Sequence, residues 1–147
     1  MLYSGVADWD CIRAVKEAVK IPVIANGDIF TAEDAVKCKA RTGADLLMLG
    51  RTTFGDPWVF EQAQAAQRGE AVPETPPLCD RVDTALRQFR LAAQDKGEHI
   101  ACLEARKHFA WYLRGVAHSG YYKEKISAIS TMDEIERIAD GIKRDLG

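Results

Sequence analysis

Metal-binding and disulfide patterns are missing from this chain of 147 residues. The four cysteines lie far apart and form no C-x-x-C pair: Cys11, Cys38, Cys79 and Cys102. The three histidines have no metal-ligand spacing with one another or with cysteine: His99, His108 and His118. Because nothing in the sequence indicates secretion, no disulfide framework is predicted, and we expect isolated thiols without a chemical role and no metal site.

Long apolar runs and a strong net charge are missing as well. No run approaches the roughly 20 residues of a membrane span, and no basic-then-apolar leader opens the chain, so the default expectation is a cytoplasmic protein. The net charge is −2, so no strong overall electrostatic field attracts the chain to nucleic acid or membranes. With 47% hydrophobic and 29% charged residues, the composition is that of a soluble globular protein. The length is enough for one ordinary domain or two small ones.

Two short hydrophobic runs, each ending in a polar turn, organise the first half of the chain. Residues 21–25 (IPVIA) end at Asn26-Gly27-Asp28, and residues 46–49 (LLML) end at Gly50-Arg51-Thr52. The segment between them is helical in character and about long enough to connect two parallel strands. Continuous apolar runs are typical of strands buried on both faces, so we expect both turns at the carboxyl edge of one parallel sheet.

These turns carry the parts of an anion site. Gly27 and Gly50 let backbone N–H groups approach a ligand closely, and Arg51 offers a planar cationic fork that matches phosphate oxygens. Asn26 can donate and accept, while Asp28 can accept from a hydroxyl or hold the turn. The alternative is a simple tight turn beside a surface cation, and spacing alone favours neither interpretation.

Helix-capping signals occur at three positions in the first half of the chain. Asp8, Thr31 and Asp56 each stand where a helix would begin, Asp56 with a proline next to it. The second of these helices should end near Gly43 and the third near Arg68. Residues before Asp8 are expected to be a strand remnant or loop, over about 1–6.

Beyond a linker at 71–77, which contains three prolines, the periodicity is entirely helical. We expect helices over about 78–96, 99–113 and 122–130, and a last helix that begins at a Thr131–Glu134 capping box. The predicted fold class is therefore α/β over 1–70, then an all-α bundle of about four helices over 78–147.

One cluster in the helical part combines cations with aromatic rings: Arg106, Lys107, His108, Trp111 and Tyr112. Such groups can hold phosphates and stack on bases. Successive residues of a helix point in different directions, so not all of them can face one ligand. From the residues alone, a solvated face with a buried Trp111 is favoured over an RNA contact.

Taken together, these motifs resemble bacterial tRNA-dihydrouridine synthases, most closely the B-type branch. The matching segments are 5–9 (GVADW), 21–29 (IPVIANGDI), 42–45 (TGAD), 48–51 (MLGR), 57–60 (PWVF) and 105–112 (ARKHFAWY). They occur in the order expected for that family and cover nearly the whole chain.

The resemblance implies a flavin-binding (β/α)8 TIM barrel followed by a helical tRNA-binding domain. It also implies FMN as cofactor, NADPH as reductant, and reduction of uridine to 5,6-dihydrouridine in tRNA. The residues that it assigns to FMN are Asn26, Gly27, Asp28, Gly50 and Arg51. The residues that it assigns to RNA are Arg106, Lys107, His108 and Tyr112.

The chain is too short for such an enzyme, because a complete barrel needs about 250 residues. By resemblance it corresponds to the C-terminal half, from a truncated gene, a split gene or a fragment. The family's proton-donating cysteine and its flavin-contacting lysine and histidine fall in the missing part, so no catalytic residue is assigned and the chain alone should be inactive. Two strands cannot close a barrel, so we expect an open apolar face, with self-association or an N-terminal partner.

Two other functions stay open at this point. One is a non-catalytic RNA-binding or assembly module derived from such an enzyme. The other is half of a different flavin oxidoreductase barrel, against which the match at 105–112 argues.

Overall fold

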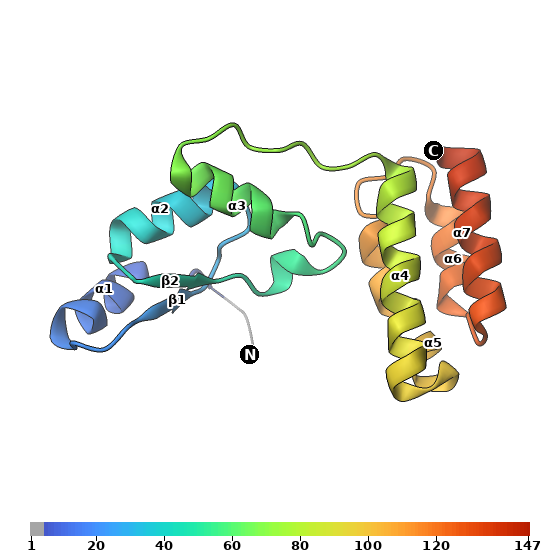
Figure 1. The fold of residues 1–147 in the computed structure, drawn as a ribbon, viewed down its shortest axis with the longest axis horizontal. Coiled ribbons are helices and arrows are strands. Elements are labelled where there is room, and N and C mark those ends of the chain that lie inside the picture. Colours follow the sequence, from blue (N-terminus) through green and yellow to red (C-terminus); the bar gives the residue numbers. More distant parts are fainter. Residues whose placement is uncertain (1–4) are drawn as a thin grey trace. The chain divides into compact units, whose positions relative to one another are not determined.

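The computed structural model describes residues 5–147, so the expected strand remnant or loop at 1–6 lies mostly outside the described residues. Contacts divide the chain into two units (Figure 1). The first comprises the residues up to Thr53 together with Pro57–Glu74, and the second comprises Phe54–Asp56 together with Thr75–Gly147.

The first unit is a two-stranded parallel sheet with helices. Its elements are α1 (Trp9–Ala18), β1 (Ile24–Asn26), α2 (Ala32–Thr42), β2 (Leu46–Met48), the 3-10 helix η1 (Arg51–Thr53) and α3 (Val59–Arg68). The strands pair in parallel, with Asn26 opposite Met48. Because α2 connects them in the predicted way, the turns that follow both strands lie at the same edge of the sheet.

Local capping explains where the first two helices begin. Asp8 Oδ1 accepts a hydrogen bond from the backbone N–H of Asp10 at 2.9 Å, at the start of α1. Thr31 and Asp34 form a reciprocal capping box on α2, which ends at Gly43 in the left-handed conformation (φ 65°). Both helix starts and the Gly43 stop were predicted and are confirmed.

The predicted start of the third helix is wrong. α3 begins at Val59, its N-cap is Trp58, and no side chain of the described residues caps it. Asp56 does not take this role because Phe54–Asp56 packs with the second unit instead. The predicted end at Arg68 is confirmed.

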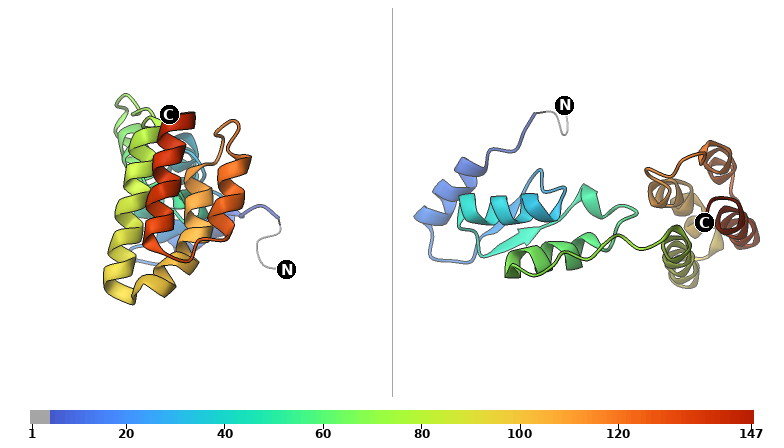
Figure 2. Two further views of the ribbon diagram at one scale, coloured as in Figure 1. Left: turned by 90° about the vertical axis from the view of Figure 1, so that its right-hand side faces the viewer. Right: turned by 90° about the horizontal axis from the view of Figure 1, so that it is seen from above.

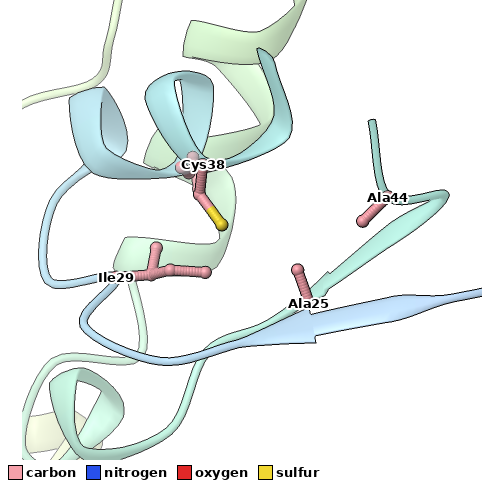
Figure 3. Packing of buried hydrophobic residues seen from close by; sticks show 6 residues of the cluster. Ala25, Ile29, Cys38 and Ala44 are labelled. Carbon is pink, nitrogen blue, oxygen red and sulfur yellow. The ribbon is translucent and has the colours of Figure 1, made fainter. Parts of the chain in front are cut away.

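Small side chains form the centre of the first unit. Figure 3 shows Ala25 of β1 and Ala44 pointing toward Cys38 of α2 and Ile29. All four are buried, and the small side chains of Ala25, Cys38 and Ala44 let α2 approach the sheet closely. Burial raises the pKa of the Cys38 thiol, which is therefore a neutral packing residue.

The opposite face of the sheet is open, which corrects the expectation that the strands are buried on both faces. Ile24, Leu46 and Met48 are 53%, 58% and 50% exposed. Side chains alternate between the two faces of a strand, and the helices of this unit cover only the face that carries Ala25. The open apolar face agrees with the expectation for a sheet of only two strands.

The second unit is a bundle of four helices, as predicted: α4 (Leu78–Lys96), α5 (Glu98–Tyr112), α6 (Gly120–Ser127) and α7 (Met132–Leu146). Figure 2 shows them side by side in one view and nearly end-on in the other. The ring centres of Phe89 and Phe109 lie 5.4 Å apart in the core. The predicted Thr131–Glu134 capping box begins α7.

Two kinds of feature are absent from residues 5–147. None of the helices in this range is long and apolar enough to cross a membrane. The same described residues contain no group of three or more His, Cys, Asp or Glu side chains placed to hold a metal ion.

Candidate functional site

The turn after β1 is joined to the segment that precedes α1. The backbone N–H of Ala7 donates to Oδ2 of Asp28 at 2.6 Å. The indole N–H of Trp9 donates to the carbonyl oxygen of Gly27 at 2.9 Å. Gly27 has φ 132°, and a Cβ there would lie 2.5 Å from Cβ of Ala7. Only glycine therefore allows the turn to lie this close to residue 7.

Arg51 lies at the same edge of the sheet, directly after β2. Its Nη2 is 3.4 Å from Oδ1 of Asp28, and its side chain is 49% exposed. The guanidinium carbon lies 5.6 Å from the centre of the Phe30 ring. Thr52 ties this segment to the first turn by donating its hydroxyl to the carbonyl oxygen of Phe30 at 2.8 Å. Asp28 and Phe30 thus hold a half-exposed guanidinium at the edge.

Asn26 and Gly50 complete the predicted set at this edge. Asn26 Nδ2 lies 3.5 Å from Sδ of Met48, on the open face of the sheet. At Gly50 a Cβ would meet nothing within 4 Å, so the main chain there borders open space. The five predicted residues therefore lie at the end of β1 or shortly after β1 and β2, and Asp28 and Arg51 contact each other.

The chemistry of this edge fits a phosphate in part. An exposed guanidinium beside an open glycine backbone can bind phosphate oxygens. The Asp28 carboxylate would repel a phosphate placed directly on it, and its two oxygens already face Ala7 N–H and Arg51. Asp28 is therefore suited to positioning Arg51 and the residue-7 segment. The sequence did not predict a role for Ala7, because no local pattern indicates a hydrogen bond to a residue 21 positions away.

A second cluster lies within the helical unit, around the ring of Phe54. Its centre is 5.9 Å from that of His108 and 5.8 Å from that of Trp111, both edge-on. Lys107 Nζ lies 5.7 Å from the same ring centre. The guanidinium carbon of Arg114 is 4.0 Å from the centre of the Trp111 ring. We call these five residues the cationic–aromatic cluster.

The other two residues of the predicted RNA set turn away from this cluster. Arg106 donates from Nε to the carbonyl oxygen of Ile129 at 2.8 Å. Tyr112 is only 3% exposed, and its hydroxyl donates to Oε1 of Gln88 at 2.9 Å. Burial raises the pKa of Tyr112, and the nearby charge of Asp56 raises it further, so this phenol stays neutral. The predicted RNA residues of α5 therefore point in different directions, as expected.

Phe54 reaches the cluster because Gly55 lies directly on the end of α5. Gly55 has φ 70°, and a Cβ there would be 2.4 Å from the carbonyl carbon of Trp111 and 2.5 Å from the backbone nitrogen of Tyr112. No side chain fits between these backbones. The aromatic ring that precedes Gly55 is thereby placed against His108 and Trp111.

A family comparison agrees with these motifs and their order. The sequence profile described as "Dihydrouridine synthase (Dus)" matches residues 1–145. The chain belongs to the dihydrouridine synthase family. The family resemblance seen in the sequence is thereby confirmed.

Among its relatives in the dihydrouridine synthase family, the chain is 37% identical over 139 residues to a Mycobacterium tuberculosis protein named "Probable tRNA-dihydrouridine synthase". That match covers 94% of this chain and 36% of the relative. It is 40% identical over 134 residues to the Vibrio cholerae protein named "tRNA-dihydrouridine synthase B", covering 90% of this chain and 41% of that protein. The chain thus spans about two fifths of the length of these relatives.

Proposed function

We propose that this chain is the FMN-anchoring and RNA-docking part of a tRNA-dihydrouridine synthase. The complete enzyme would reduce uridine to 5,6-dihydrouridine in tRNA, with FMN as cofactor and NADPH as reductant. The observation that carries the proposal is the parallel pairing of β1 and β2, which brings Arg51 to within 3.4 Å of Asp28 at one sheet edge. Membership of the family and the names of the relatives support the reaction class.

Each residue of the edge has a separate role in this proposal. Arg51 and the backbone at Gly50 bind the phosphate of FMN, and Asn26 on the open face offers a donor and an acceptor to the rest of the cofactor. Asp28 holds Arg51, and Gly27 keeps the turn against residue 7. FMN, when bound, supplies the hydride-transfer chemistry that protein side chains lack.

The helical unit is proposed to dock RNA through the cationic–aromatic cluster. Lys107 and His108 take the contacts with RNA, because both lie beside the ring of Phe54. Arg106 and Tyr112 hold the bundle together through their bonds to Ile129 and Gln88. We assign no catalytic residue, and the chain by itself is proposed to be inactive.

The first unit is proposed to be the last βα units of a (β/α)8 TIM barrel. In a barrel, the face with Ile24, Leu46 and Met48 would point inward and be covered by the remaining strands. An N-terminal half of the enzyme is therefore the proposed partner, and without it the face is available for self-association.

The FMN anchor is tested by titrating the chain with FMN and following quenching of flavin fluorescence. We expect saturable binding that Arg51→Ala weakens about tenfold or more, the scale of a lost charge-assisted bidentate contact. Riboflavin, which lacks the phosphate, should bind with the same affinity to the variant and the original chain. Arg68→Ala removes a cation from the exposed end of α3 and should have no effect. Absence of saturable FMN binding, or equal FMN binding by Arg51→Ala, would overturn the anchor.

A non-catalytic RNA-binding module is the second candidate function. It is favoured by one observation: every member of the cationic–aromatic cluster belongs to the helical unit, so this surface needs no residue of the first unit. Binding of tRNA by the chain without any binding of FMN would favour this function over the enzyme part.

A further inference from the structure

The helical unit contains a cavity of about 340 Å³ next to the cationic–aromatic cluster. Its wall includes Phe54, Asp56, Thr75, Arg81, Trp111 and Arg114. The volume lies within the ~300–1,000 Å³ typical of small-molecule sites, with room for a nucleobase and its sugar. The lining combines two aromatic rings, two guanidinium groups and one carboxylate.

Both guanidinium groups are fixed in place by the chain. Arg81 donates from Nη2 to the carbonyl oxygen of Arg114 at 3.3 Å and also to the carbonyl oxygen of Tyr112. The guanidinium carbon of Arg114 in turn lies 4.0 Å from the centre of the Trp111 ring. A cation held in advance binds a phosphate with less loss of side-chain freedom.

One oxygen of the Asp56 carboxylate lacks a hydrogen-bond donor. Its Oδ1 is buried and has no hydrogen-bond partner among residues 5–147. A buried acceptor without a partner is unfavourable, and native proteins usually satisfy such groups. Asp56 also lines the cavity, so a rotation of its carboxyl group would bring this acceptor to a ligand that carries N–H groups.

We propose that this cavity binds one unpaired nucleotide of an RNA and that it prefers guanine. The inference rests on the RNA-docking function proposed above. The base would stack on the Arg114–Trp111 pair, and its phosphate would be bound by the arginines of the wall. Asp56 would accept from the Watson–Crick edge of the base.

The preference for guanine follows from the arrangement of donors on each base. Guanine presents two adjacent N–H donors, at N1 and N2, which match a carboxylate. Uracil presents a single N–H between two carbonyl oxygens, and these oxygens would repel Asp56. The unsatisfied Oδ1 therefore selects against uracil more strongly than stacking alone can.

The test uses the full chain and two labelled single-stranded RNAs, oligouridine and the same oligomer with one central guanosine, followed by fluorescence anisotropy. We expect at least about fivefold tighter binding of the guanosine oligomer, the lower end of discrimination by one base contact. Asp56→Asn, which is nearly isosteric, should bind both oligomers equally. Arg114→Ala should weaken binding of both, and Arg144→Ala, an exposed arginine of α7, should change neither.

The outcomes separate this inference from the proposed function. Absence of binding to either RNA would overturn RNA docking and the cavity together. Binding without a guanosine preference, or a preference that persists in Asp56→Asn, would overturn the cavity assignment and leave RNA docking in place. If Asp56→Asn does not fold, the guanine preference is tested on the original chain by quenching of its tryptophan fluorescence. Guanosine monophosphate should quench this fluorescence. Equal quenching by uridine monophosphate would contradict the proposal.

Discussion

Ala7 and Asp28 are joined by a hydrogen bond of 2.6 Å although 21 residues separate them. The same carboxylate lies 3.4 Å from Nη2 of Arg51. One side chain therefore connects three segments: the approach to α1, the turn after β1 and the start of η1. In this arrangement Asp28 positions the proposed phosphate-binding cation.

Two substitutions of Asp28 distinguish the stabilisation by its hydrogen bond from that by its charge. Asp28→Ala leaves the Ala7 N–H without its acceptor and should lower the free energy of unfolding by about 1–3 kcal/mol. Asp28→Asn keeps an acceptor and tolerates the positive φ of 48°, so its loss should be smaller. Urea unfolding measures both. Equal destabilisation by the two variants would show that the bond to Ala7 contributes nothing.

Gly27 and Gly50 form a matched pair of glycines at the edge. Gly27→Ala would bring a Cβ to within 2.5 Å of Ala7 at φ 132°, and we expect a loss of about 1–3 kcal/mol in unfolding free energy. Gly50→Ala has open space around it and should stay within about 0.5 kcal/mol. Its added methyl group should instead weaken FMN binding. Thermal unfolding and flavin titration of both variants give the comparison, and a stable Gly27→Ala would refute the close approach.

Gly55 can be compared with Gly115, since their φ values are 70° and 76°. Alanine at Gly115 adds only backbone strain, of about 1 kcal/mol. Alanine at Gly55 adds a collision with the backbone of Trp111 and should therefore destabilise the helical unit by about 1–3 kcal/mol more. Unfolding followed by near-UV circular dichroism of the tryptophans measures the difference, and equal losses would mean that the contact with α5 does not form.

Glu134 makes the helical unit sensitive to acid. Its carboxylate accepts from the backbone N–H of Ser130 at 2.7 Å, from the Ser130 hydroxyl and from the backbone N–H of Thr131. These bonds hold the pKa of Glu134 below its usual range, the backbone bond from Ser130 contributing most. A folded pKa below the unfolded one means that the stabilisation is complete above the unfolded pKa of about 4.3 and is lost as pH falls through the folded value.

The Glu134 effect is measured by urea unfolding between pH 6 and pH 3. The stability difference between the original chain and Glu134→Gln should be largest at pH 6 and should shrink toward pH 3. Glu124→Gln, at an exposed position of α6, is the matched control substitution. A constant difference for Glu134→Gln would contradict the assigned bonds.

The open face of the sheet should drive self-association of the chain. Leu46 is 58% exposed on this face, and Leu91 is 56% exposed on α4 of the helical unit. Light scattering after gel filtration should show oligomers that Leu46→Lys dissociates and Leu91→Lys leaves intact. A monodisperse monomer of the original chain would rule out self-association through this face.

Local sequence signals predicted much of the fold. Thr31 with Asp34, and Thr131 with Glu134, begin helices because both partners lie within one helical turn. The parallel pairing was predicted because two apolar runs flank a segment about long enough for a crossover. Asp56 carries a local helix-start signal but does not cap α3, because the adjoining Gly55 packs on the end of α5 and the 54–56 segment belongs to the helical unit.

The sequence predicted that the candidate residues lie at one sheet edge, and it did not predict how they contact one another. Arg51 and Asp28 were expected at one edge, and the structure shows them in contact. That Asp28 also holds Ala7 was not foreseeable from spacing. On α5, the sequence grouped Arg106 and Tyr112 with Lys107 and His108, whereas the first two bond inward.

The sequence by itself determined the helix caps, the two strand runs, the glycine turns and the family, because each depends on residues close together in the chain or on their order. Only the tertiary structure decided which distant groups meet: the Asp28 carboxylate with the backbone N–H of Ala7, the Phe54 ring with His108 and Trp111, and Arg81 with the backbone of Arg114. Contacts between distant segments depend on how the helices pack, and packing depends on the shapes of many side chains at once.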